Sequence, residues 1–135
     1  MGYAVMANTE AGGMVSGTVQ SCNGDHLLVW GPGGLVRALR AEGCLLAPAT
    51  GDNVLVAMTA SGEAWVISVL RRKRETAELR LPEHTVMHAR QLGIQAEHAS
   101  LEAAVLQMRG QEVRLEGKSM VLHSRLLSLG GKVLL

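Results

Sequence analysis

The chain has 135 residues and a formal net charge of +1, with 47% hydrophobic, 19% charged and only 2% aromatic residues. This hydrophobic content excludes an intrinsically disordered chain. Two tryptophans and one tyrosine are too few for the stacking surfaces with which proteins bind single-stranded nucleic acids. No apolar run reaches the roughly 18 residues of a transmembrane helix, and no secretory signal pattern is present. We therefore expect a cytoplasmic protein.

Residues 1–12 show no periodic pattern and are expected to form an N-terminal arm. Residues 13–72 contain five short apolar segments with strand-like patterns, separated by turns rich in Gly, Pro, Asn and Asp. The expected strands are residues 15–20, 26–30, 35–39, 53–58 and 64–70. Five short strands at this spacing predict a small antiparallel β-barrel of the oligonucleotide/oligosaccharide-binding (OB) type, with an SH3-like barrel as the near alternative.

Four further side chains of this barrel region carry expectations. Trp30 and Trp65 are expected to fill the core or rim of the barrel. Cys22 and Cys44 lack CxxC spacing, and in a reducing cytoplasm we expect both to be free, buried thiols.

Charge marks a boundary after the barrel. The first 70 residues carry a formal charge of −3, whereas residues 71–74 are Arg-Arg-Lys-Arg. A nucleic-acid-binding surface needs basic residues spread over a face, and the rest of the chain has no such stripe. We interpret the basic run as exposed and residues 73–78 as a basic linker, with no nucleic-acid partner expected.

Residues 79–135 are expected to form a repetitive stem. They contain short units in which two apolar residues flank one residue that is usually polar. The unit starts fall at 94, 101, 106, 113, 120 and 127, with Leu134 next, so the step is seven residues except for one step of five. Apolar residues two apart indicate strands, because a coiled coil would place them three and four apart.

One segment also fits a helix. Ser100 is a suitable N-cap, strong helix formers follow it, and Gly110 is a suitable stop. Helix and strand therefore both remain open for residues 100–110.

If the units are strands, each offers one narrow apolar face and needs neighbours to cover it. The stable solutions are a thick solenoid or several identical chains wound about one axis, and thin seven-residue coils favour an intertwined homotrimer. Stacking about eight units at roughly 4.8 Å each gives a β-helix or β-prism of the order of 40 Å. The predicted trimer core consists of Ile94, Leu101, Val113, Leu115, Leu122, Leu127 and Leu129.

The mainly β arrangement of a small barrel followed by a glycine-punctuated prism resembles the central spikes of contractile injection machines. These include the phage cell-puncturing device and the valine-glycine-repeat (VgrG) spike of type VI secretion. More closely, Gly17-x-Val19, Cys44-Leu45-Leu46-x-Pro48, Gly51-Asp52-x-Val54 and Ala64-Trp65-Val66-Ile67 resemble the family designated domain of unknown function 3540.

The resemblance to this family is clear over residues 13–75, whereas the stem matches only in its pattern of units. It implies a structural or adaptor protein near the type VI spike, with the spike, a proline-alanine-alanine-arginine (PAAR) tip protein, a chaperone or an effector as possible partners. The protein could then be exported as part of a secretion spike. The resemblance carries over no catalytic residue.

The residues themselves predict no catalytic, cofactor or metal site. His84 and His88 are four apart, but Pro82 lies just upstream and the HExxH pattern of zinc enzymes is missing. The glycine-rich residues 31–34 lack the Lys-Ser/Thr of a phosphate-binding loop and are expected to form a hairpin turn. The alternative to a spike is a monomeric OB-fold module that binds nucleic acid or glycan.

Overall fold

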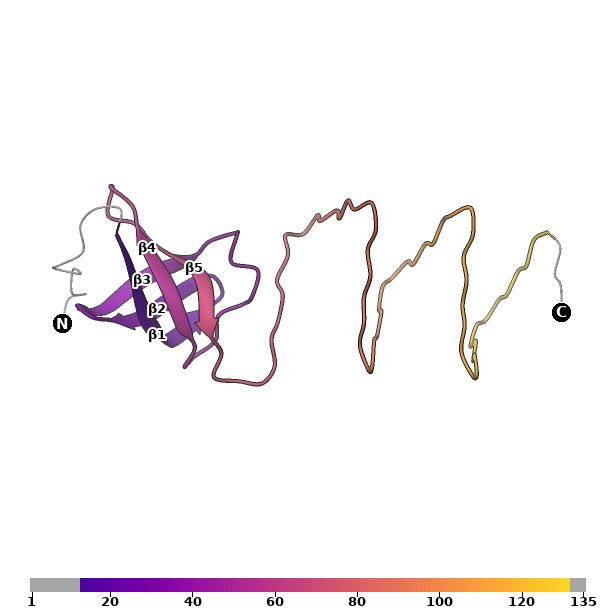
Figure 1. Ribbon diagram of the computed structural model, residues 1–135, viewed down its shortest axis with the longest axis horizontal. Helices are drawn as coiled ribbons and strands as arrows, with labels where there is room; N and C mark the ends of the chain where they lie inside the picture. The colour runs from indigo at the N-terminus through magenta and orange to yellow at the C-terminus, as the bar shows by residue number, and fades with distance from the viewer. Residues whose placement is uncertain (1–12, 132–135) are drawn as a thin grey trace. The chain divides into compact units, whose positions relative to one another are not determined.

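The structure is a computed structural model that describes residues 13–131. The chain divides into two compact units, Met1–Ala89 and Arg90–Leu135. The strands of the described part lie in the first unit (Figure 1), and all five predicted strands are confirmed with small shifts at their ends. Their bounds are β1 Met14–Asn23, β2 His26–Gly31, β3 Gly34–Arg40, β4 Asn53–Met58 and β5 Ala64–Arg71.

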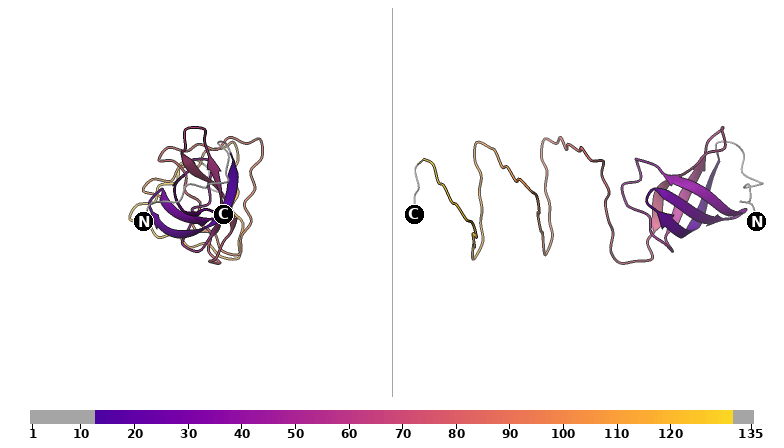
Figure 2. Two further views of the ribbon diagram at one scale, coloured as in Figure 1. Left: turned by 90° about the vertical axis from the view of Figure 1, so that its left-hand side faces the viewer. Right: turned by 180° about the vertical axis from the view of Figure 1, so that it is seen from behind.

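The strands form a closed barrel in the order β1-β2-β3-β5-β4. Figure 2 shows the barrel from two further sides. Strand β1 closes the barrel because it pairs antiparallel with both β2 and β4. Strands β3 and β5 pair parallel, with Leu39 opposite Trp65 and Arg40 opposite Val66, so the expectation of an antiparallel barrel is wrong at this pairing. A register shift between Val19 and Ser21 bends β1 across its two partners. Closure leaves no free edge among these five strands.

The barrel core is aliphatic and follows the two-residue period of the strands. Neither tryptophan joins it. Trp30 is 49% exposed and Trp65 is half-buried, because each alternates with inward-facing valines on β2 and β5. The core alternative of the expectation is therefore wrong for both tryptophans, whereas a position at the rim stays a prediction. The buried hydrophobic residues of this core are Val19, Leu27, Val29, Val36, Ala38, Cys44, Val54, Val56, Ala64 and Val66.

Two glycines have positions that other residues cannot easily take. Gly24, in the turn between β1 and β2, has a φ of 62°. Gly17 lies in β1 under close backbone approach: a Cβ atom there would come within 2.5 Å of Val29 Cγ1 and 2.6 Å of the Trp30 carbonyl oxygen. The hairpin turn predicted at residues 31–34 is confirmed, with Gly31 paired to Gly34.

Beyond residue 80 the described chain contains no helix and no strand. The helical alternative for residues 100–110 is therefore wrong, and the strands predicted for the stem are represented only by an isolated bridge between Leu46 and Leu79. The predicted arm, residues 1–12, and Leu134 lie outside the described residues. Residues 13–131 include no helix that could cross a lipid bilayer.

The segment after residue 80 is extended and interrupted by bends (Figure 1). The bends lie at residues 83–84, 90–91, 97–98, 104–105, 111, 118 and 125, which is a constant step of seven, and a further bend follows at residue 131. The step of five read from the sequence is therefore wrong. The units that start at Ile94 and Leu101 begin two residues later after their bend than the units from residue 106 onward, which makes one step appear shorter.

The close approach at Gly17 predicts a specific loss of stability. Gly17→Ala is expected to lower the free energy of unfolding by about 1–3 kcal/mol, because the new methyl group meets backbone and a fully buried valine. Gly43→Ala is the matched control, since nothing lies within 4 Å of its Cβ position. Urea unfolding followed by circular dichroism measures both. Equal effects of the two substitutions would contradict this account of β1.

Candidate assembly interface

The bends divide residues 83–131 into seven heptads, and each place in the heptad has a consistent chemistry. We number the bend residue that opens each heptad as the first position. The third and fifth positions are large and apolar except at Thr85 and Ala99, and the seventh is always small. The third positions are Thr85, Leu92, Ala99, Leu106, Val113, Met120 and Leu127; the fifth are Met87, Ile94, Leu101, Met108, Leu115, Leu122 and Leu129; the seventh are Ala89, Ala96, Ala103, Gly110, Gly117, Ser124 and Gly131.

The seven side chains predicted as a trimer core all occupy third or fifth positions. In the single chain they are exposed, from 53% for Val113 to 79% for Ile94. The chain itself therefore does not cover them, and their assignment to a core stays a prediction. Leu101, Leu115, Leu122, Leu127 and Leu129 lie between these limits, at 60–72% exposure.

The backbone of the same segment is also without partners inside the segment. Among residues 81–131, no backbone N–H donates to a backbone carbonyl of that stretch. Extended backbone with unpaired N–H and C=O groups is a template for pairing with another chain. Exposed apolar pairs and an unpaired backbone thus occur together, which is the combination expected of an assembly surface.

The segment that leads into the heptads is fixed to the barrel. Its backbone pairs antiparallel with the loop between β3 and β4: the Ala47 N–H donates to Glu78 O at 2.8 Å, and the Arg80 N–H donates to Leu45 O at 3.0 Å. Residues 78–80 therefore form a short backbone pairing in addition to the pairings of the five barrel strands.

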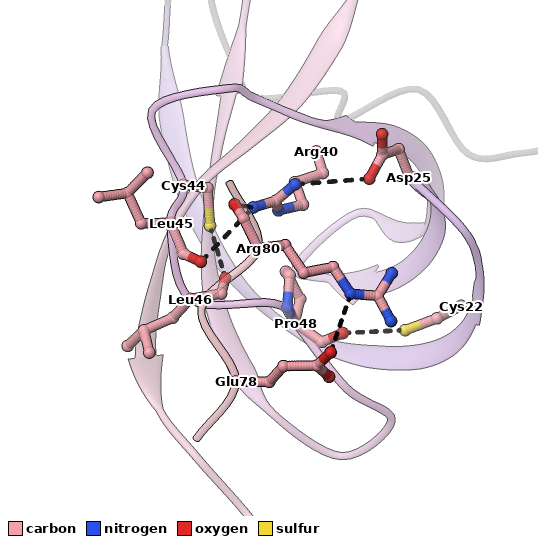
Figure 3. A network of polar contacts seen from close by, with 9 residues as sticks. All are labelled: Cys22, Asp25, Arg40, Cys44, Leu45, Leu46, Pro48, Glu78 and Arg80. Carbon is pink, nitrogen blue, oxygen red and sulfur yellow. Dashed lines mark hydrogen bonds and ion pairs between the residues drawn. The ribbon is translucent and has the colours of Figure 1, made fainter. Parts of the chain in front are cut away.

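Arg40 reinforces this pairing from the end of β3 (Figure 3). Its Nη2 donates to Arg80 O at 2.8 Å and to Leu45 O at 3.5 Å, so one guanidinium ties both paired segments together. Its Nη1 lies 3.6 Å from Asp25 Oδ1. The side chain is only 11% exposed, and its Nε atom is buried without a hydrogen-bond partner.

Asp52 fixes the basic run in a second way. It is 2% exposed, and within residues 13–131 it is the one charged side chain that is fully buried. Its Oδ1 accepts from the Lys73 N–H and its Oδ2 from the Ala49 N–H, both at 2.9 Å. Charge-assisted bonds of this kind are stronger than neutral ones. We call Asp52, Arg40 and their backbone partners the exit clasp, because they hold the chain where it leaves β5.

Sequence reasoning did not identify the clasp. Arg40 and Asp52 were visible only as contributions to charge, and Gly51-Asp52 only as turn residues. The available signal was an acidic residue directly before the apolar run of β4, but its partner at Lys73 is 21 residues away and becomes a neighbour only through folding.

Within the described part of the chain, no three or more Cys, His, Asp or Glu side chains lie together so that they could hold a metal ion. Cys44 is buried and free as expected, but Cys22 is exposed, so that half of the expectation is wrong. Cys22 lies near the end of β1, beyond the inward-facing positions of the strand. Partial desolvation of the sulfur atom raises the pKa of both thiols, including that of Cys22, although the residue as a whole is exposed. His84 and His88 lie in the extended segment.

A groove of about 430 Å³ lies over β2 and β3. The end of the β1–β2 hairpin and the β4–β5 turn close its sides. Its surface is mainly apolar, with His26, Arg37 and Glu63 as its ionisable groups. Among the described residues that line it there is no Phe, Tyr or Trp, the side chains on which bases most often stack in OB-type barrels.

Comparison with known proteins identifies a family. The model of the family described as "Protein of unknown function (DUF3540)" matches residues 17–135, which includes the barrel strands and the heptads. No curated protein matches the chain, and no solved structure does.

The exit clasp predicts how one substitution acts. Asp52→Asn replaces one acceptor oxygen by a donor that faces a backbone N–H, and is expected to cost about 2 kcal/mol of unfolding free energy. It should also speed tryptic cleavage at the basic run, because Lys73 loses its anchor. Asp25→Asn is the control, with an expected cost below about 1 kcal/mol, since the Asp25 side chain is 63% exposed. Unchanged cleavage in Asp52→Asn would contradict the clasp.

Proposed function

Because the chain belongs to the DUF3540 family, a family of proteins of unknown function, we propose a function from its own physical properties. Three copies assemble through their heptads into a spike-like β-helical element. The protein is non-enzymatic and acts as a structural adaptor of a type VI secretion spike, where it helps to assemble or load a tip protein or effector.

The heptads carry this proposal. A segment of about fifty residues presents apolar pairs at a fixed spacing, has no backbone partners of its own and contains no helix. Exposing this much apolar surface is costly in water, at roughly 25 cal/mol per Å². Burial against identical copies removes this cost and supplies partners for the backbone at the same time.

The regular bends support three copies. An extended chain that changes direction at every seventh residue winds around an axis, whereas a straight one would add to a flat sheet. A prism with three faces is the smallest closed solution. The small residues at the seventh position suit its corners, where adjacent faces approach each other and a larger side chain would collide.

The barrel and clasp support the adaptor role. The closed strand order with a parallel β3–β5 pairing fits an OB-like barrel, which is folded in itself and offers an outer surface for partners. The clasp fixes the start of the heptad segment on that barrel, so that a load on the assembled stem is passed to a folded domain. The type VI setting comes from the resemblance to the VgrG spike.

The assembly model predicts the mass of the protein in solution. We expect about three times 14.3 kDa by light scattering coupled to size exclusion. Val113→Asp should abolish the trimer, because it puts a carboxylate at a third position, at a cost of several kcal/mol per chain. Val121→Asp is the matched control: it makes the same change at an outward-facing fourth position and should leave the trimer intact.

Two results would overturn the assembly model. One is a compact monomer in the unchanged protein, which would favour the monomeric binding module and turn attention to the groove over β2 and β3. The other is an equal response of the two valine variants, because the model assigns them to opposite faces of the strand.

The proposed secretion role predicts which proteins the trimer binds. Co-expression with a PAAR tip protein and the VgrG spike protein of a type VI system should give a purified complex that contains the trimer and a single tip protein. The Val113→Asp variant should lose this complex while its barrel stays folded by circular dichroism. A trimer that binds neither protein would leave the assembly model standing and would remove the secretion role.

A further inference from the structure

The apolar positions alone do not specify the register in which three chains align. Third and fifth positions are apolar in nearly every heptad, so a slip by one whole heptad would bury almost the same side chains. Register in β-structures is weakly specified where the pattern repeats in this way. A stem with a unique structure therefore needs a second set of residues that distinguishes one heptad from the next.

The geometry of a three-chain prism defines which residues become neighbours. One heptad crosses one face, and the next heptad of the same chain crosses the next face. Each face then carries strands from the three chains in rotation. The strand beside one heptad is the following heptad of a neighbouring copy, about 4.8 Å away. Residue i of one chain thus stacks beside residue i+7 of another.

The charges of the heptads match this spacing. At the sixth position, Glu102, Arg109 and Glu116 follow one another in consecutive heptads. At the first position, Glu83, Arg90 and Glu97 do the same. None of these six residues takes part in an ion pair within residues 13–131. Signs that alternate at a spacing of seven are complementary to the same sequence shifted by seven.

We propose that these alternating columns set the register in which three copies of this chain stack. Glu102 of one copy pairs with Arg109 of the next, and Arg109 of that copy pairs with Glu116 of the third. The inference deepens the proposed function, because it rests on the trimer of that proposal.

The columns also disfavour the nearest wrong alignments. A slip that stacks residue i beside i+14 places Glu102 next to Glu116 and Glu83 next to Glu97. A slip that stacks identical residues places Arg109 beside Arg109. Like charges directly opposite each other destabilise paired strands, and unlike charges stabilise them. Over residues 83–97 and 102–116, the alignment at i+7 is therefore the only one of the three in which both columns attract. Lys118 and Arg125, two further first positions, repel each other in this alignment.

A cross-linking experiment tests the register directly. In a Cys22→Ser background, Glu102→Cys is combined with Arg109→Cys in the full chain and oxidised. The i+7 alignment places the two Cα atoms about 4.8 Å apart, inside the range of about 4.4–6.8 Å for disulfides. A covalent trimer on a non-reducing gel is expected. Glu102→Cys with Glu116→Cys is the control: its sites lie about 9.6 Å apart and should not link the copies.

Two charge-reversal variants test the electrostatics: one is expected to lower the melting temperature of the trimer and the other to raise it. Arg109→Glu creates three consecutive glutamates and should lower the melting temperature of the trimer by several degrees at low salt. Adding Glu102→Arg and Glu116→Arg restores alternation and should restore the temperature. Arg125→Glu makes the same change at a first position. In the i+7 alignment this residue lies beside Lys118 of a neighbouring copy, so the reversal replaces a repulsion by an attraction and should raise the melting temperature of the trimer.

The outcomes separate this inference from the proposed function. A trimer that cross-links at 102/116 rather than 102/109, or that melts equally with either arginine reversed, overturns the register rule and leaves the trimer standing. A monomeric unchanged protein overturns both.

Discussion

Backbone pairing is the constraint on which the rest of this protein depends. In the barrel, every strand has partners on both sides within the chain, and closure through β1 leaves no edge open. Between residues 81 and 131 the backbone is also extended, but none of its N–H groups donates to a backbone carbonyl of the same stretch. Unpaired extended backbone and exposed apolar side chains are features of interaction surfaces. The barrel thus pairs its strands within one chain, whereas the second part presents the surface on which the proposed assembly rests.

The exit clasp lies where the barrel ends and the extended segment begins. Asp52 and Arg40 each use a charged group to hold backbone atoms of the segment that follows β5. Both are largely removed from solvent, where a charge is retained only if it has partners. This arrangement fixes the first residues beyond the barrel without extending the core. It also explains why a basic run that is mostly exposed begins in a defined conformation.

The heptads divide their roles between apolar and charged positions. The third and fifth positions provide area for burial, which is strong but hardly distinguishes one heptad from another. The charged columns provide little burial but differ between heptads, so they can select an alignment. In the proposed assembly, stability and register therefore come from different residues of the same seven-residue unit.

Much of the barrel was determined by the sequence itself. The two-residue period of valines and leucines and the turn residues between them located all five strands, since each of these signals is local. The same reasoning found the seven-residue period of the tail. It misjudged the phase of the repeat between Ile94 and Val113, however, because two consecutive apolar pairs look alike whichever position they are counted from. It also left a helix open at residues 100–110, where propensity and periodicity disagreed.

Only the tertiary structure decided the pairings between residues distant in sequence. The parallel contact of β3 with β5, the bond from Lys73 to Asp52 and the contact of Arg40 with Arg80 all join segments that carry no local sign of each other. It also decided that the tryptophans stay outside an aliphatic core and that the bends fall at every seventh residue. Local patterns record which way a side chain faces, whereas the identity of its partner is fixed only when the barrel closes.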